Sequence, residues 1–145
     1  MQIHTIGFTQ KSAEQFFGLL QNAGIERLID IRISNSSQLA GFTKSADLRY
    51  FLQAILNADY VQEPRLAPTQ QLLEDYRKKR VSWDDYVRIF NGLLEERQIA
   101  TTLDRSLFER PAVLLCSEPT AEHCHRRLVA EYLQRHWDDV TVVHL

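Results

Sequence analysis

Apolar and polar residues along this chain follow two patterns that alternate from the N-terminus to the C-terminus. Short apolar runs bounded by glycine, proline or polar residues are typical of buried strands. Between them, apolar residues recur every three or four positions, which is typical of helices with one buried face. The strand pattern covers residues 2–6, 28–31, 59–61, 111–116 and 139–144, and the helix pattern covers 12–24, 44–57, 69–79, 82–99 and 119–136.

Strands that alternate with helices predict an α/β fold, because each helix crosses over the sheet and brings the next strand parallel to the last. We expect a parallel-dominated sheet of about four or five strands with helices on both faces. The unbroken apolar run Pro111–Cys116 predicts a strand at the centre of this sheet. The chain has 145 residues, a usual length for one domain, so we predict a single α/β domain over residues 1–145.

Composition narrows the class of protein only broadly. Apolar residues make up 44% of the chain, charged residues make up 25%, and the net charge is -2, so the overall charge indicates neither a nucleic-acid nor a membrane partner. No apolar stretch approaches the ~20 residues that cross a bilayer. The two cysteines, Cys116 and Cys124, are eight positions apart and could in principle form one disulfide. Because the chain shows no secretory leader, we expect instead a cytoplasmic protein in which both thiols are reduced.

The polar residues that stand out lie where three predicted strands end. The first strand leads into Gly7, and the second ends in Asp30-Ile31-Arg32 before a polar loop at 34–43. The strand at 111–116 runs into Cys116-Ser117-Glu118. Loops and helix N-termini converge at the carboxyl ends of parallel strands, where they present free N–H groups to ligands. We therefore predict a functional site at this rim of the sheet.

Cys116 is a candidate nucleophile at the rim. A helix N-terminus stabilises a nearby thiolate, and a helix is predicted to start at Pro119. A cysteine that ends an apolar strand also packs well as a structural residue, and the sequence leaves both roles open. The phosphate-binding loop of a cysteine phosphatase is excluded, because Glu122 stands where that loop needs an arginine, six residues after the cysteine.

His125 is predicted to face the site from the helix that follows. A helix that starts near Pro119 places His125 in its second turn, where an imidazole can act as a general base. Simple packing between strand and helix explains this histidine equally well. Arg126 and Arg127 point about 100° apart around a helix, so at most one of them enters the site, and we favour Arg126.

Asp30 and Arg32 alternate along a strand and therefore point to the same face. We interpret the pair either as a buried salt bridge or as two groups aimed at a ligand. Together these segments predict candidate catalytic residues and candidate ligand-binding residues. The first set is Cys116, Glu118 and His125, and the second is Gly7, Asp30, Arg32, Ser117 and Arg126.

A metal site is a weaker alternative. Its ligands would be Cys116, Cys124 and His125, with Glu118 or His123 as a further one. The Cys-x7-Cys-His spacing is not a standard zinc spacing, and Cys124 and His125 diverge if both lie within a helix. We therefore predict no metal ligands. We also interpret the basic run at 77–80 as a solvated helix end rather than a nucleic-acid patch.

The rim segments resemble the signatures of a widespread prokaryotic family, the domain-of-unknown-function 488 (DUF488) family. The similar segments are Thr5-Ile6-Gly7, Asp30-Ile31-Arg32, Leu115-Cys116-Ser117-Glu118 and Cys124-His125-Arg126. The sequence departs from the family's frequent pattern at Phe8, where histidine or tyrosine often follows the glycine, and at 35–38, where many members carry proline and arginine. The resemblance implies an α/β fold and a site at the rim, and it implies no reaction.

The favoured function is an enzyme or a binding protein for a small anionic or nucleotide-like ligand, held by helix N-termini together with Arg32 or Arg126. A nucleic-acid-associated or protein-interaction module, using the loop at 34–43 and the basic run at 77–80, is one alternative. A metal-binding module is another. The sequence specifies no reaction, no cofactor and no oligomeric state.

Overall fold

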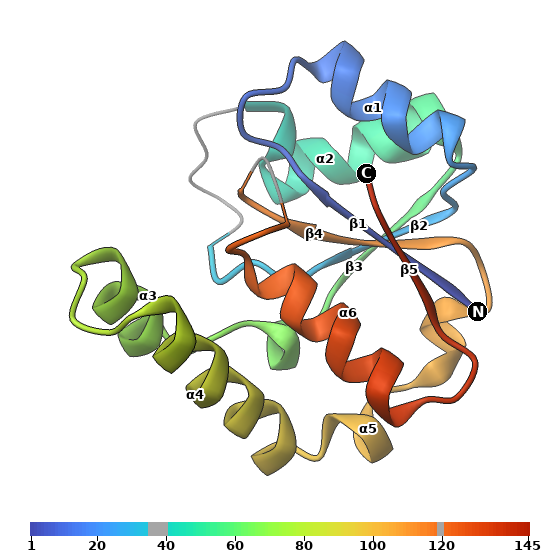
Figure 1. Ribbon diagram of the computed structural model, residues 1–145. Coiled ribbons are helices and arrows are strands. Elements are labelled where there is room, and N and C mark those ends of the chain that lie inside the picture. Colours follow the sequence, from blue (N-terminus) through green and yellow to red (C-terminus); the bar gives the residue numbers. More distant parts are fainter. Residues whose placement is uncertain (35–40, 119–120) are drawn as a thin grey trace.

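A computed structural model describes residues 1–34, 41–118 and 121–145 of the chain (Figure 1). Within these residues, five strands form one sheet in the order β3-β2-β4-β1-β5, and every neighbouring pair is parallel. The predicted α/β class and the central position of the apolar 111–116 strand are confirmed. The strands are β1 (Gln2–Gly7), β2 (Arg27–Asp30), β3 (Asp59–Gln62), β4 (Ala112–Cys116) and β5 (Thr141–His144).

Helices cover both faces of the sheet, as the alternating pattern predicts (Figure 1). One face carries α1 (Ala13–Asn22) and α2 (Ser45–Phe51), which continues as a π-helical turn at Leu52–Leu56. The other face carries α6 (His125–His136). α4 packs on α6, and it is contacted in turn by α3 and by the short α5. These three helices are α3 (Gln70–Arg77), α4 (Trp83–Glu96) and α5 (Ile99–Thr102).

Helices α1, α3 and α4 begin where the sequence pattern places their caps. Ser12, Thr69 and Ser82 each accept a hydrogen bond from the backbone N–H three residues later, at 3.1 Å in each case. The predicted helix at 82–99 ends earlier, at Glu96, because Gln98 takes a left-handed conformation with a φ of 53°. For these three helices, the cap residues in the sequence locate the starts.

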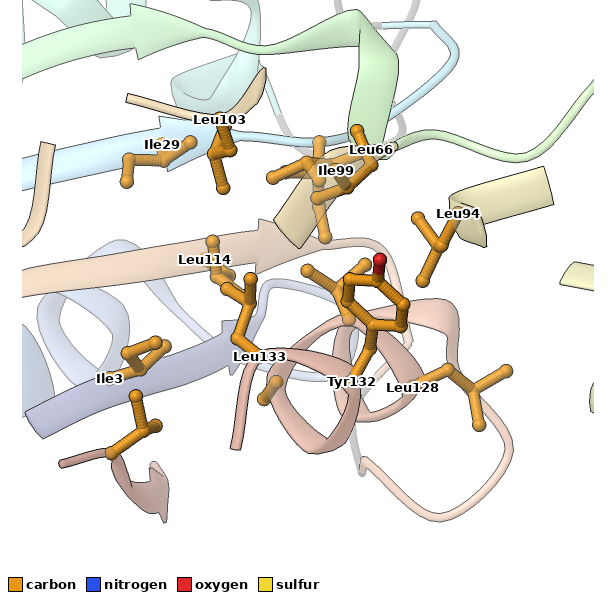
Figure 2. Close-up of a cluster of buried hydrophobic side chains, with 14 of the residues drawn as sticks. Ile3, Ile29, Leu66, Leu94, Ile99, Leu103, Leu114, Leu128, Tyr132 and Leu133 are labelled. Carbon is orange, nitrogen blue, oxygen red and sulfur yellow. The ribbon is translucent and has the colours of Figure 1, made fainter. Parts of the chain in front are cut away.

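Two apolar clusters hold the helices against the sheet. Successive residues of a strand point to opposite faces, so Ile3 joins the cluster beneath α6 and Ile6 joins the cluster beneath α1. Burying one side chain of this size contributes about 1.5–3 kcal/mol. The clusters thereby fix α6 over the strand ends that carry the site. Figure 2 shows the cluster on the α6 side, including Leu128, Tyr132 and Leu133 from α6 and Ile29 and Leu114 from the sheet.

The polar loop predicted at 34–43 lies mostly outside the described residues. Ser34 and a 3-10 turn at Gly41–Thr43 are the described parts of it. In the described part of the chain, no helix has both the length and the apolar character needed to span a membrane.

Candidate functional site

The three predicted rim segments meet at one edge of the sheet. β4 lies between β1 and β2 and pairs with both. Gly7 of β1 is therefore level with Cys116, and Asp30 of β2 is level with Leu115. Because the three strands are parallel, their carboxyl ends open in the same direction. Residues far apart in the sequence come together there.

A pocket with a volume of about 510 Å³ lies at this rim. Small-molecule sites in proteins usually have volumes of about 300–1,000 Å³. The wall combines the strand ends, the start of α6 and part of the α3–α4 pair. Five residues of the predicted site line it, namely Arg32, Cys116, Ser117, Glu118 and His125. Gly7, Asp30 and Arg126 lie behind this wall and contact the residues that form it.

Asp30, the last residue of β2, forms a buried salt bridge with Arg32. The guanidinium Nε and Nη2 donate to the two carboxylate oxygens of Asp30, each at 2.8 Å, and only 2% of the Arg32 side chain and none of the Asp30 side chain is exposed. Nη2 also donates to the backbone carbonyl of Thr43 at 2.8 Å. The hydroxyl of Tyr60 donates to Asp30 at 2.5 Å. Burial, together with this bond, raises the pKa of Tyr60 to about 12.

Arg32 lines the pocket in addition to forming the salt bridge. Its carbon Cζ lies 5.5 Å from the centre of the Phe8 ring, and both residues line the pocket. The third nitrogen, Nη1, is buried without a hydrogen-bond partner among the residues that the structure describes. The guanidinium is therefore anchored along the edge formed by Nε and Nη2, and its Nη1 has no partner among the described residues.

Cys116 and Cys124 are joined by a disulfide, so the expectation of two reduced thiols is wrong for this structure. The reason lies in the start of α6. The helix begins at His125 instead of Pro119, which itself lies outside the described residues, and Cys124 is its N-cap with extended backbone angles of φ -136° and ψ 142°. Cys124 therefore leaves the helical stripe that the sequence assigns to it and reaches Cys116. Both cysteines line the pocket.

His125 is the first residue of α6, and the predicted position in a second helical turn is also wrong. Its ring nitrogen Nε2 lies 2.7 Å from the carbonyl oxygen of Ile31. A carbonyl only accepts, so Nε2 carries the proton and Nδ1 keeps a free lone pair. Nδ1 lies 3.5 Å from Sγ of Cys116. Burial lowers the pKa of His125 to about 4, against the effect of the bond to Ile31, so the imidazole is neutral at neutral pH.

Arg126 lies behind the pocket wall, in space that Gly7 leaves for it. The side chain is fully buried, and Nη1 donates to the backbone carbonyl of Glu118 at 2.5 Å. A Cβ atom on Gly7 would overlap both Nη1 and that carbonyl. Burial lowers the pKa of Arg126, opposed by the attraction of Glu118, and the guanidinium remains charged. Arg127 instead pairs with Glu131 at the surface.

Sequence reasoning missed the part of the pocket wall that helices α3 and α4 supply. Arg77 of α3 and Tyr86 of α4 line the pocket, and so does His123, which the sequence offered only as a further ligand of the alternative metal site. Trp83 stacks on His123 with a ring-centre distance of 4.7 Å, so it supports the wall from outside. Arg77 belongs to the run interpreted as a solvated helix end. Helical periodicity identifies the buried faces of α3 and α4, and it does not tell whether those faces cover the sheet or its rim.

The fold and the pocket define a parallel α/β protein with a candidate ligand site at the carboxyl ends of its central strands. A family model described as "Domain of unknown function DUF488" matches residues 12–133, which is most of the chain. The chain therefore belongs to the DUF488 family, and the predicted resemblance is confirmed. The match includes Asp30, Cys116 and Cys124-His125-Arg126 and begins after Gly7. Comparisons with curated proteins and with solved structures find no match.

Proposed function

We propose that this protein binds a small anionic ligand, of the size of a mononucleotide or smaller, in the rim pocket. The observation that carries the proposal is the buried guanidinium of Arg32, which lines the pocket and keeps Nη1 unpartnered among the described residues. A buried N–H group without an acceptor is unfavourable, and a ligand oxygen would relieve that cost. Carboxylate and phosphate oxygens are the strongest acceptors for a guanidinium.

The charges around the pocket favour an anion. Asp30 offsets the charge of Arg32, and Arg77 supplies a second positive charge from the C-terminal end of α3. The N-terminus of α6 also opens on the pocket, and helix N-termini present unpaired N–H groups and a partial positive charge. Glu118 lies on the same wall with the opposite charge. A ligand that carries hydroxyl or amino groups beside its anionic group would bind both the positive groups and Glu118.

The apolar part of the wall favours a ligand that is larger than a bare ion. Phe8, Leu73 and Tyr86 line the pocket together with the polar groups. Ligand sites usually combine such apolar surface with a few polar groups that fix orientation. A ring system could pack against Phe8 or Tyr86 while its phosphate reaches Arg32. We therefore favour a mononucleotide or a similar ring phosphate.

Titration calorimetry with AMP and with inorganic phosphate tests this proposal. We expect one AMP site per chain, with weaker binding of phosphate because phosphate leaves the apolar wall unused. Arg77→Ala should weaken AMP binding about fivefold, since one charge near the ligand contributes about 1 kcal/mol. Lys78→Ala is the matched control, because Lys78 is an exposed neighbour of Arg77 that is not part of the pocket lining, and it should leave the affinity unchanged.

Two outcomes would overturn the proposal. One is the absence of heat and of saturation with both probes. The other is an equal loss of affinity in Arg77→Ala and Lys78→Ala, which would assign binding to the general basic surface of α3 instead of the pocket.

A further inference from the structure

We infer that Cys116, Cys124 and His125 form a binding site for a divalent cation of the zinc class when their disulfide is reduced. The two sulfur atoms and a ring nitrogen of the histidine all lie within 4.8 Å of one another. All three residues are buried and line the rim pocket. Thiolate and imidazole are the ligands that zinc prefers, whereas magnesium and calcium take oxygen ligands.

The distance between Cys116 and His125 already fits a tetrahedral zinc site. With a Zn–S bond of about 2.3 Å and a Zn–N bond of about 2.0–2.1 Å, the S···N edge of a tetrahedron is about 3.5 Å. Sγ of Cys116 lies 3.5 Å from Nδ1 of His125. These two ligands would bind one ion without a change in their separation.

The hydrogen bond of His125 prepares its ring for metal binding. Nε2 donates to the carbonyl of Ile31 at 2.7 Å, which fixes the ring orientation and leaves the Nδ1 lone pair free on the side of Cys116 Sγ. Histidines that bind metals commonly donate their other N–H to a carbonyl or a carboxylate in this way. The backbone of β2 and its continuation thus supplies the outer support for the site.

Cys124 can bind the same ion as His125 although the two residues are adjacent in the sequence. Two adjacent residues inside a helix diverge, but Cys124 is the extended N-cap of α6 and only His125 is helical. The Cα atoms of Cys116 and Cys124 are 7.3 Å apart, compared with about 4.4–6.8 Å in most disulfides. This backbone spacing leaves room for two sulfurs that share one ion.

Three protein ligands leave one position of a tetrahedral ion unfilled, as in catalytic zinc sites. Because all three ligands line the pocket, we place this position on the pocket side. An anion bound there could complete the coordination, a role that rests on the proposed function. Metal binding itself requires no anion.

The sulfurs of Cys116 and Cys124 cannot form the disulfide and bind a metal ion at the same time. A phosphine reductant breaks the Sγ–Sγ bond, is oxidised to the phosphine oxide with an oxygen atom from water, and leaves two thiols. A divalent ion then displaces the two thiol protons and binds two thiolates. The site would therefore hold a metal only in a reducing environment.

Titration of the reduced protein with Co²⁺ under anaerobic conditions, after removal of the reductant, tests the inference. Co²⁺ replaces zinc at such sites, and its thiolate bonds give a sulfur-to-metal charge-transfer absorption. We expect one Co²⁺ per chain with this absorption, and its loss when one equivalent of Zn²⁺ is added. The oxidised protein should bind none. Elemental analysis and titration of free thiols give independent readouts.

Substitutions of the proposed ligands test where the ion binds. His125→Gln should weaken Co²⁺ binding at least tenfold, and Cys124→Ala should abolish the charge-transfer band of a two-thiolate site. His136→Gln is the matched control, since His136 is an exposed histidine at the opposite end of α6 and is not part of the pocket lining, and this variant should bind Co²⁺ as the unchanged chain does. Circular dichroism shows whether each variant is folded. For a variant that unfolds, alkylation of both thiols in the unchanged chain is the substitute and should prevent binding.

The inference is overturned if the reduced, folded protein binds no stoichiometric Co²⁺, or if binding survives thiol alkylation. Co²⁺ binding by the reduced protein, without AMP binding, would reject the anion proposal alone. AMP binding to the oxidised protein without Co²⁺ binding to the reduced protein would reject the metal site alone.

Discussion

Gly7 and Arg126 fit together so closely that a Cβ atom on the glycine would overlap the guanidinium nitrogen Nη1 of the arginine. Gly7 ends β1, and Arg126 is the second residue of α6. Arg126 also donates a hydrogen bond to the backbone carbonyl of Glu118. Its side chain therefore connects the end of β1, the loop after β4 and the start of α6. We expect the position of Cys124 and His125, the two residues before Arg126, to depend on this contact.

Gly7→Ala should therefore destabilise the fold strongly. The new methyl group meets a backbone carbonyl that cannot move without displacing the loop after β4, so we expect a loss of about 3 kcal/mol in the free energy of unfolding by urea. Gly92→Ala is the control, because this exposed helical glycine of α4 has open space around it. It should leave stability unchanged or raise it by up to ~1 kcal/mol. Similar losses in both variants would contradict the packing described for Gly7.

Arg32→Met should cost about 3–5 kcal/mol of stability, because it leaves the carboxylate of Asp30 buried without its main partner. Adding Asp30→Leu to this variant should recover most of the loss, since the unpaired charge is then gone. Urea denaturation of the two single variants and the double variant measures this coupling. Additive losses in the double variant would show that the two side chains do not depend on each other.

Tyr60→Phe should remove a hydrogen bond to a charged group, at a cost of about 1.5–3 kcal/mol at neutral pH. The pKa of Tyr60 rises from 10.0 in the unfolded chain to about 12 in the native protein. Below pH 10 both states keep the proton, so the full contribution is present. As pH rises from 10 to about 12, unfolding releases a proton and the contribution declines. The stability difference between the unchanged chain and Tyr60→Phe should narrow across this window, and a constant difference would contradict the raised pKa.

Reduction of the disulfide should destabilise the protein by about 2.5 kcal/mol, which is the loop-closure contribution expected for cysteines eight positions apart. If the reduced cysteines bind zinc, an excess of Zn²⁺ should restore part of this stability by mass action. Thermal unfolding of the oxidised, reduced and zinc-loaded protein measures both effects. The double variant Cys116→Ala with Cys124→Ala should respond to neither reductant nor Zn²⁺.

Much of the fold can be predicted from the sequence, because burial repeats along each element with a fixed period. The apolar run ending at Cys116 shows a strand that is buried on both faces, and the caps at Ser12, Thr69 and Ser82 have side-chain oxygens that mark helix starts. The meeting of three strand ends at one rim follows from parallel topology.

The start of α6 cannot be predicted from the sequence, and the disulfide between Cys116 and Cys124 depends on it. Pro119 favours the first position of a helix, whereas Cys124 makes no side-chain cap hydrogen bond that would mark it as an N-cap. The helix start depends on tertiary contacts, among them the space that Gly7 leaves for Arg126. The contribution of Arg77 to the pocket also depends on how α3 packs over the rim.

The central claim is that an anionic ligand binds at the rim pocket, and mapping of backbone amide chemical shifts on the oxidised, 15N-labelled protein during titration with AMP tests it most directly. We predict saturable shifts concentrated at the amides of Thr9, Arg32, Ser117 and His125, which line the pocket. Shifts concentrated instead at the exposed basic residues 78–80, or no saturable shifts at all, would contradict the claim.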